Sequence, residues 1–149
     1  MELGGSINEQ TQIDNGRSKK VIVMTDRVQL NSITRTIIRA SYAVSNTLQP
    51  GYLEKVRENA LAYELKLMGV KVCQQFSVPV VYKDMIVGDY VCDLFVEGEV
   101  LVELKAATAL NEFHYARCLN HLKASGLKVC LLINFGSHPM SIKRFVNRF

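Results

Sequence analysis

Residues 91–106, VCDLFVEGEVLVELKA, form an apolar stretch that carries charged side chains at Asp93, Glu103 and Lys105. Both halves of the stretch are rich in β-forming residues, and the Glu-Gly-Glu between them is a turn signal. Two such runs joined by a short loop that contains glycine are typical of a β-hairpin. Since a buried charge is costly unless it is paired or bound to a ligand, this hairpin must pack where something compensates its charges.

The register of this hairpin determines which charged side chains meet. If Val96 pairs with Val100 across the loop, counting back along both strands places Asp93 opposite Glu103. Residues directly opposite each other lie about 5 Å apart between their Cβ atoms, and alternate residues of a strand share a face. We therefore expect Asp93, Glu103 and Lys105 to converge on one face of the hairpin, although a β-bulge would shift the register by one residue.

Two interpretations explain such a cluster of charges. Two carboxylates at this distance repel each other unless a cation lies between them, and hard divalent metals such as Mg²⁺ prefer oxygen ligands. A neighbouring ammonium group, here that of Lys105, can then hold a nucleophilic water or stabilise negative charge on a phosphate. The alternative is an ion pair of Lys105 with Glu103 or with Asp93 on a half-exposed sheet face. The residues alone leave both interpretations open.

Composition and charge restrict the class of protein. A chain of 149 residues is long enough for one domain with a buried core, and 48% hydrophobic with 21% charged residues is typical of a globular protein. The net charge of +4 permits contact with a polyanion without requiring it. No apolar run approaches the ~20 residues that span a bilayer, and the N-terminus lacks the pattern of a signal peptide. We expect a cytoplasmic protein with no membrane partner.

The cysteines support the same compartment. Cys73, Cys92, Cys118 and Cys130 show no CxxC spacing, and three of the four lie in apolar runs. We therefore expect buried, reduced thiols rather than disulfides or a zinc site.

The remaining pattern divides the chain into a leader and one domain. Residues 1–20 are polar and rich in glycine and asparagine, and we interpret them as a flexible leader before a single domain at 21–149. Periodicity and turn signals predict helices at 26–48, 52–68 and 110–124, strands at 70–82, 85–96, 100–106 and 128–135, and a short basic helix at 142–149. This order predicts an α/β (α+β) fold with a mixed sheet of about four strands flanked by helices.

The element order, with Asp93 on one hairpin strand and the triplet Glu103-Leu104-Lys105 on the next, resembles the PD-(D/E)XK nuclease superfamily. Within it the chain is similar to the small bacterial GxxExxY proteins, because Gly51-Tyr52-Leu53-Glu54 stands where that family has GxxE. The segments VELKA at 102–106 and LLINFG at 131–136 also look like the family. The resemblance covers about residues 26–147 and implies a restriction-endonuclease-like αβββαβ core.

The resemblance also implies a site and an activity. Asp93 and Glu103 would bind Mg²⁺ or Mn²⁺, and Lys105 would position the attacking water. Glu54 would orient the site, with Glu64 as an accessory residue. The implied activity is metal-dependent hydrolysis of phosphodiester bonds in nucleic acid, with DNA favoured over RNA. The resemblance leaves open whether the protein is a homodimer.

Three positions depart from the family pattern. The tyrosine that ends GxxExxY is Arg57 here, and in the later helix the family glutamine is Arg117 and the family tyrosine is His121. A guanidinium at these positions can contact phosphates, or it can pair with the carboxylates and take the place of the metal. The second case describes a catalytically inactive nuclease fold that binds nucleic acid or a protein partner. The sequence does not decide between them.

Other polar residues near the expected site have simpler explanations. Glu58 is one turn from Glu54 and is expected on a solvated helix face. For His114 and His121, a metal or general-base role is open, but a polar helix face is favoured. Four basic residues near the expected site would suit a nucleic-acid backbone, although scattered surface lysines usually have no such role: Lys55, Arg57, Arg117 and Lys123.

Overall fold

The computed structural model describes the backbone of residues 7–14, 17–24 and 26–147, and side chains from residue 27 to residue 147. The helices in this part of the chain are α1 (Asp26–Thr47), α2 (Glu54–Leu67) and α3 (Glu112–Ser125). The strands are β1 (Ile7–Asp14), β2 (Arg17–Met24), β3 (Val72–Tyr82), β4 (Met85–Val96), β5 (Val100–Lys105), β6 (Val129–Asn134) and β7 (Ser141–Val146).

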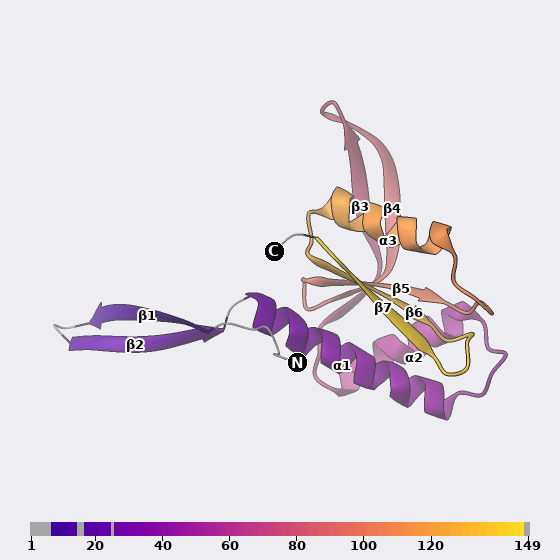
Figure 1. The fold of residues 1–149 in the computed structure, drawn as a ribbon, viewed down its shortest axis with the longest axis horizontal. Coiled ribbons are helices and arrows are strands. Elements are labelled where there is room, and N and C mark those ends of the chain that lie inside the picture. The colour runs from indigo at the N-terminus through magenta and orange to yellow at the C-terminus, as the bar shows by residue number, and fades with distance from the viewer. Residues whose placement is uncertain (1–6, 15–16, 25, 148–149) are drawn as a thin grey trace.

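The main sheet has five strands in the order β3-β4-β5-β6-β7. Strands β5 and β6 are parallel and are connected through α3, whereas the other neighbouring pairs are antiparallel. Helices α1 and α2 lie on one face of the sheet and α3 lies on the other (Figure 1). The predicted α+β class with a mixed sheet flanked by helices is therefore confirmed, with one more strand than expected.

The additional strand replaces a predicted helix. We expected a short basic helix at 142–149, but residues 141–146 form β7, antiparallel to β6, and residues 148–149 lie outside the described part of the chain. Ile142 and Phe145 are three residues apart, which resembles helical spacing. In a strand this odd spacing sends them to opposite faces, where Ile142 packs on the α1–α2 side and Phe145 on the α3 side. The strand also supplies hydrogen-bond partners along one edge of β6.

The N-terminal segment contains a hairpin where we expected a leader without regular structure. Strands β1 and β2 pair antiparallel from Ile7 with Met24 to Asp14 with Arg17. The sequence between them is Asn-Gly, the dipeptide most typical of two-residue hairpin loops, and this signal was overlooked. The boundary predicted at residue 20 falls inside β2. The division into leader and domain stays a prediction.

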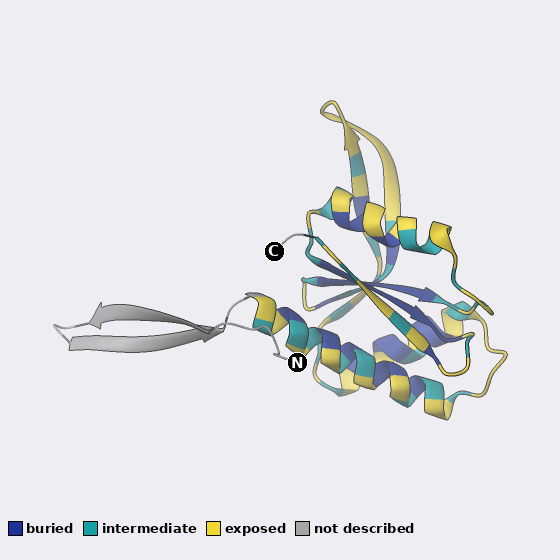
Figure 2. Ribbon diagram, in the orientation of Figure 1, coloured by how far each residue is buried: buried dark blue, intermediate teal, exposed yellow. Residues whose placement is uncertain are grey.

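Two apolar cores separate the sheet from its helices. The core on the α1–α2 side includes Ile37, Leu61 and Leu104, and the core on the α3 side includes Leu101 and Leu122. All residues of β6 are buried, as its continuous apolar sequence predicts for a central strand covered on both faces (Figure 2). The outer half of the β3–β4 hairpin is exposed and extends beyond the sheet (Figure 2).

Helix α2 buries a face that is partly charged. Val56 and Leu67 of the helix, and Leu53 just before it, are exposed. The buried positions are Arg57, Glu58, Leu61, Ala62 and Leu65. The helix therefore turns two charged residues inward, and both have hydrogen-bond partners.

A close backbone contact at Gly136 fixes the end of β5 beside the end of β6. Asn134 Oδ1 accepts hydrogen bonds from the N–H groups of Ala107 and Gly136, both at 3.0 Å, and Asn134 Nδ2 donates to Ala107 O at 2.9 Å. A Cβ atom at residue 136 would lie 2.4 Å from Ala107 O and 2.5 Å from Ala107 N. Because these are backbone atoms, only a shift of the chain after Lys105 can relieve the overlap.

We expect Gly136→Ala to lower the free energy of unfolding by about 2 kcal/mol through this overlap. Chemical denaturation followed by circular dichroism measures the change. Gly88→Ala is the matched control, because a Cβ atom there meets nothing within 4 Å. Equal stabilities of the two variants would contradict the tight packing at Gly136.

Candidate functional site

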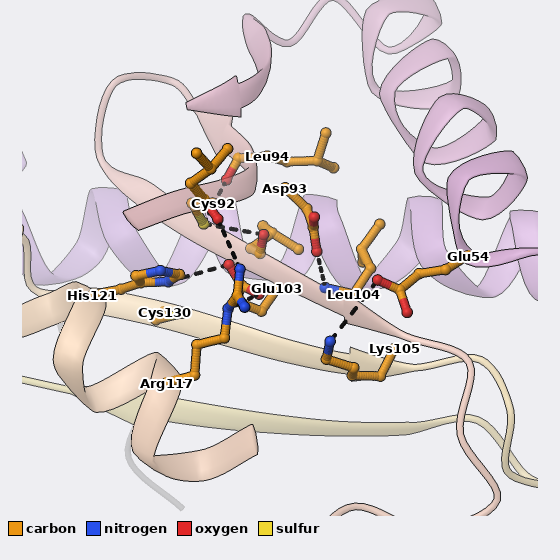
Figure 3. Close-up of polar contacts among 12 residues, drawn as sticks. Glu54, Cys92, Asp93, Leu94, Glu103, Leu104, Lys105, Arg117, His121 and Cys130 are labelled. Atoms are coloured by element: carbon orange, nitrogen blue, oxygen red, sulfur yellow. Dashed lines mark hydrogen bonds and ion pairs between the residues drawn. The ribbon is translucent and has the colours of Figure 1, made fainter. Parts of the chain in front are cut away.

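The candidate site lies where β4 and β5 meet the start of α2 and the middle of α3 (Figure 3). The predicted hairpin register is confirmed over three pairs, Val96 with Val100, Phe95 with Leu101 and Leu94 with Val102. The ladder ends there, one residue before Asp93 would face Glu103. The carboxylate of Asp93 takes over from the ladder: its Oδ2 accepts the backbone N–H of Leu104 at 2.8 Å.

Strand β4 is distorted at this point. Its ladder with β3 joins Gln74 to Leu94 and Phe76 to Cys92, but Gln75 has no partner residue and has a φ of 54°. Cys92 packs in the α3-side core whereas Leu94 packs in the α1–α2-side core, so the alternation of faces breaks at Asp93. A positive φ is unfavourable for glutamine, which marks a strained position of the kind that gathers at functional sites.

Glu103 is buried, with 1% of its surface exposed, and its charge is compensated from α3. Arg117 Nε lies 3.2 Å from Glu103 Oε2, and the same guanidinium donates to Val91 O at 3.1 Å. His121 Nδ1 lies 3.1 Å from Glu103 Oε1, although the two groups are not aligned for a hydrogen bond. Among the described residues, Lys105 pairs with neither Glu103 nor Asp93, so the ion pairs considered from the sequence do not form.

Lys105 contacts the first residue of α2 instead. Its Nζ lies 4.0 Å from Glu54 Oε1, and the two side chains are 23% and 42% exposed. A pair this long and this accessible contributes little to stability. Figure 3 shows Glu54 and Lys105 pointing toward each other, with Asp93 beside Leu104.

The folded protein disfavours the charged form of the Asp93 carboxyl group. Burial is the main cause that raises its pKa to about 6, and the negative charge of Glu103 raises it further. The carboxylates of Glu54 and Glu58 act in the same direction, while the Leu104 N–H opposes the shift. The repulsion between Asp93 and Glu103 expected from the sequence is therefore present in the fold.

Gln75 contacts Asp93, and Glu58 holds Gln75 in place. The sequence did not indicate a role for Gln75, and it favoured a solvated position for Glu58. Glu58 is buried, not solvated, and accepts hydrogen bonds from Lys55 Nζ at 2.7 Å, Gln74 Nε2 at 2.6 Å and Gln75 Nε2. The Gln75 amide also lies 3.5 Å from Asp93 Oδ1. It therefore bridges α2 to Asp93. Two adjacent glutamines in an otherwise apolar strand were the available signal.

The remaining α2 residues of the prediction do not join the site. Arg57 is buried between the rings of Tyr52 and Phe135 and donates to Gln49 O at 2.8 Å, so its guanidinium stabilises the loop between α1 and α2. In the described part of the chain it does not pair with any carboxylate of the site, and its side chain is buried. Among the described residues, the carboxylate of Glu64 forms no hydrogen bond or ion pair.

The two histidines of α3 do not share one polar helix face as expected. His114 lies in the first turn of the helix, where it forms a capping box with Asn111. His121 is fully buried beside Glu103 and makes an edge contact with the ring of Tyr90, so the polar-face interpretation is wrong for it. All four cysteines are free thiols; Cys92 and two others are buried, while Cys73 is exposed.

The family model described as the PD-(D/E)XK nuclease superfamily matches residues 31–146. The chain belongs to this superfamily. A solved structure with a similar fold, an alkaline exonuclease from Laribacter hongkongensis, has 11% sequence identity, covers 83% of this chain and 71% of its own, and gives a TM-score of 0.48. Comparison with curated proteins finds no match. Membership of the GxxExxY family within the superfamily stays a prediction.

The assignment of Asp93, Glu103 and Lys105 to the superfamily motif stays a prediction, and the structure places the three residues on the neighbouring strands β4 and β5. Among the described residues, Asp93 Oδ1 has one hydrogen-bond contact, with Gln75 at 3.5 Å, and Glu103 Oε1 has no aligned hydrogen bond. Two carboxylate oxygens are thus available, which fits a hard divalent cation held by carboxylates, waters and substrate phosphate.

No helix in the described part of the chain is long and apolar enough to span a bilayer.

Proposed function

We propose that this chain is a metal-dependent nuclease that hydrolyses phosphodiester bonds of nucleic acid, with DNA as its substrate and the cytoplasm as its compartment. One observation carries the proposal: Asp93 and Glu103 repel each other, each retains an available oxygen, and Lys105 is adjacent. Such an arrangement does not serve the stability of the fold, since the charged form of Asp93 is disfavoured beside Glu103 and, among the described residues, no cation pairs with it.

The proposed roles follow from the surroundings of each side chain. Asp93 and Glu103 would hold Mg²⁺ or Mn²⁺, which when bound would neutralise charge on the phosphate and lower the pKa of a water. The Leu104 N–H fixes the orientation of the Asp93 carboxylate through Oδ2 and leaves Oδ1 for the cation. The bridging amide of Gln75 supports Asp93 from the other side.

Lys105 is suited to act on the water or on the phosphate. Its ammonium group is partly exposed and, among the described residues, pairs with Glu54 alone, at 4.0 Å, so no strong ion pair holds it there. Glu54 would then orient Lys105 rather than bind the cation. An ammonium in this position can hold the attacking water or stabilise charge that develops on the phosphate oxygens.

A second candidate is supported by Arg117. Its guanidinium contacts Glu103 Oε2 at 3.2 Å and so supplies a positive charge at the acidic pair without a metal. In this case the chain is a catalytically inactive member of the superfamily that binds nucleic acid or a protein. The contact leaves Glu103 Oε1 available, which is why we favour the enzyme.

The deciding experiment is cleavage in the presence of Mn²⁺. Labelled linear duplex DNA, single-stranded DNA and RNA are incubated with the protein and Mn²⁺, Mg²⁺ or EDTA, and calorimetry measures Mn²⁺ binding separately. We expect Mn²⁺-dependent cleavage of DNA. Mn²⁺ binding without cleavage of any of the three substrates would favour the inactive binding module, and an absence of both would refute the metal-dependent nuclease.

Lys105→Met is expected to lower Mn²⁺-dependent cleavage by at least about 100-fold, because the ammonium that aids the reaction is lost. The free energy of unfolding should change by less than about 1 kcal/mol, since only a partly exposed 4.0 Å contact is removed. Cleavage assays and denaturation curves on the same preparation measure both. A large loss of stability would instead indicate that Lys105 is a structural partner of the acidic residues.

A further inference from the structure

Glu103 also belongs to a second cluster, which lies between β4, β5 and α3. Ligand atoms of Cys92, Glu103 and His121 all lie within 4.8 Å of one another, and the three residues are at most 1% exposed. Figure 3 shows His121 from α3 and Cys92 from β4 near the Glu103 carboxylate. Asp93 is not part of this group.

The cluster leaves polar atoms unsatisfied. Glu103 Oε1 and His121 Nδ1 are buried and lie 3.1 Å apart without an aligned hydrogen bond, and among the described residues His121 Nε2 has no hydrogen-bond partner. The Cys92 thiol lies near two weak acceptors, Val102 O at 3.3 Å and Leu94 O at 3.5 Å. A buried polar atom without a partner costs about 1–3 kcal/mol, so this group is unfavourable unless a ligand binds it.

We propose that Cys92, Glu103 and His121 form a binding site for a thiophilic divalent cation of the Zn²⁺ type. Thiolate, imidazole and carboxylate together are a ligand set typical of zinc, whereas Mg²⁺ takes oxygen ligands. Three protein ligands leave the fourth tetrahedral position for water or another ligand. The cysteine proton passes to solvent when the sulfur binds the cation.

Arg117 contacts the cluster without occupying its ligand atoms. Its side chain is half exposed and lies 3.2 Å from Glu103 Oε2, whereas Glu103 Oε1 lies 3.1 Å from His121 Nδ1. Zn²⁺ binding goes beyond the proposed function and does not depend on it. Only one consequence does: Zn²⁺ would take Glu103 from Asp93 and inhibit Mn²⁺-dependent cleavage.

Cobalt absorption spectroscopy tests the site without an activity assay. Co²⁺ is added to the reduced, metal-free protein, and Zn²⁺ is then added to displace it. We expect a thiolate-to-cobalt charge-transfer band that saturates at one Co²⁺ per chain and disappears with Zn²⁺. The band should be lost in Cys92→Ser. In His121→Gln the affinity for Co²⁺ should be at least 10-fold lower. Cys73→Ser, which changes an exposed cysteine on β3, should keep the band unchanged.

X-ray absorption at the zinc edge of the wild-type protein gives a second measurement that needs no variant to fold. One sulfur neighbour with nitrogen and oxygen neighbours is expected. A wild-type protein with no cobalt band, a band that survives in Cys92→Ser, or a zinc site without sulfur would overturn the proposal. A sulfur-ligated cation in a protein that cuts nothing with Mn²⁺ would keep this inference and refute the nuclease, so the two failures are distinguishable.

Discussion

Asp93→Asn is expected to stabilise the metal-free protein by about 1–2 kcal/mol at pH 7 and to reduce Mn²⁺-dependent cleavage by about 1,000-fold. The stabilisation follows because asparagine removes a charge that burial and Glu103 disfavour, yet it keeps an oxygen to accept the Leu104 N–H. The estimate is reduced below the full effect of the pKa shift because Asp93 is only partly buried. The loss of cleavage follows because an amide is a poor ligand for a hard cation.

The pH dependence has a definite sign. The pKa of Asp93 is raised from 3.8 to about 6 in the folded protein, so the folded state binds the proton more tightly than the unfolded chain does. The free energy of unfolding of the wild type should therefore fall as the pH rises from about 4 to about 6. The variant lacks this group, so its advantage should be small at pH 4 and complete above pH 6.

Chemical denaturation in EDTA at several pH values, together with Mn²⁺ calorimetry, measures these effects. Asp89→Asn on the same strand is the matched control, because Asp89 is exposed and accepts a hydrogen bond from the Ser77 hydroxyl, its one side-chain partner among the described residues. It should change stability by less than about 0.5 kcal/mol and leave cleavage intact. If Asp93→Asn clearly destabilises the metal-free protein, the bond to Leu104 outweighs the repulsion and Asp93 is a structural residue.

Local patterns in the sequence predicted the strands β3 to β6, but not the hairpin of β1 and β2 or the strand β7. The turn at Glu97-Gly98-Glu99 set the register of the β4–β5 hairpin, and the apolar run of β6 predicted a fully buried strand. Both signals are contained in a few neighbouring residues. The helix predicted at 142–149 was wrong because the spacing of Ile142 and Phe145 suits a helix as well as an edge strand with two covered faces. Only the pairing with β6 decides between the two.

The compensation of Glu103 was not predictable in the same way. Glu103 and Arg117 are far apart in sequence and meet only because α3 crosses over the sheet between β5 and β6. The inward turn of His121 depends on the same packing. The distortion at Asp93 depends on Gln75, which has no strong preference for a positive φ. The sequence identified the acidic residues and the lysine, whereas their surroundings required the assembled fold.

The two candidate functions therefore differ in what compensates the charge of Glu103, an arginine alone or a metal. One oxygen is held by Arg117, and the other faces a histidine and lies available to a cation. An arginine that permanently replaces a metal and an arginine that holds Glu103 until a metal binds give the same metal-free structure. They differ in what happens when the arginine is removed.

Arg117→Ala is expected to lower the free energy of unfolding in EDTA by about 3 kcal/mol, because it leaves the buried carboxylate of Glu103 without its cation. In saturating Mn²⁺ this deficit should shrink to less than about 1 kcal/mol if the metal takes the place of the guanidinium, and the affinity for Mn²⁺ should rise at least about 10-fold. Lys123→Ala, an exposed position on the same helix, is the control and should behave as the wild type.

The two candidate functions predict opposite responses to Mn²⁺ in this variant. A metal-dependent nuclease must recover stability, since Asp93 and Glu103 would bind the cation better without a neighbouring positive charge. In a fold in which arginine has replaced the metal, these carboxylates bind no Mn²⁺. Arg117→Ala would then be equally unstable in EDTA and in Mn²⁺. Denaturation curves of the variant and the wild type under both conditions separate these outcomes. An unchanged deficit would remove the nuclease proposal and leave the inactive binding module as the function of this site.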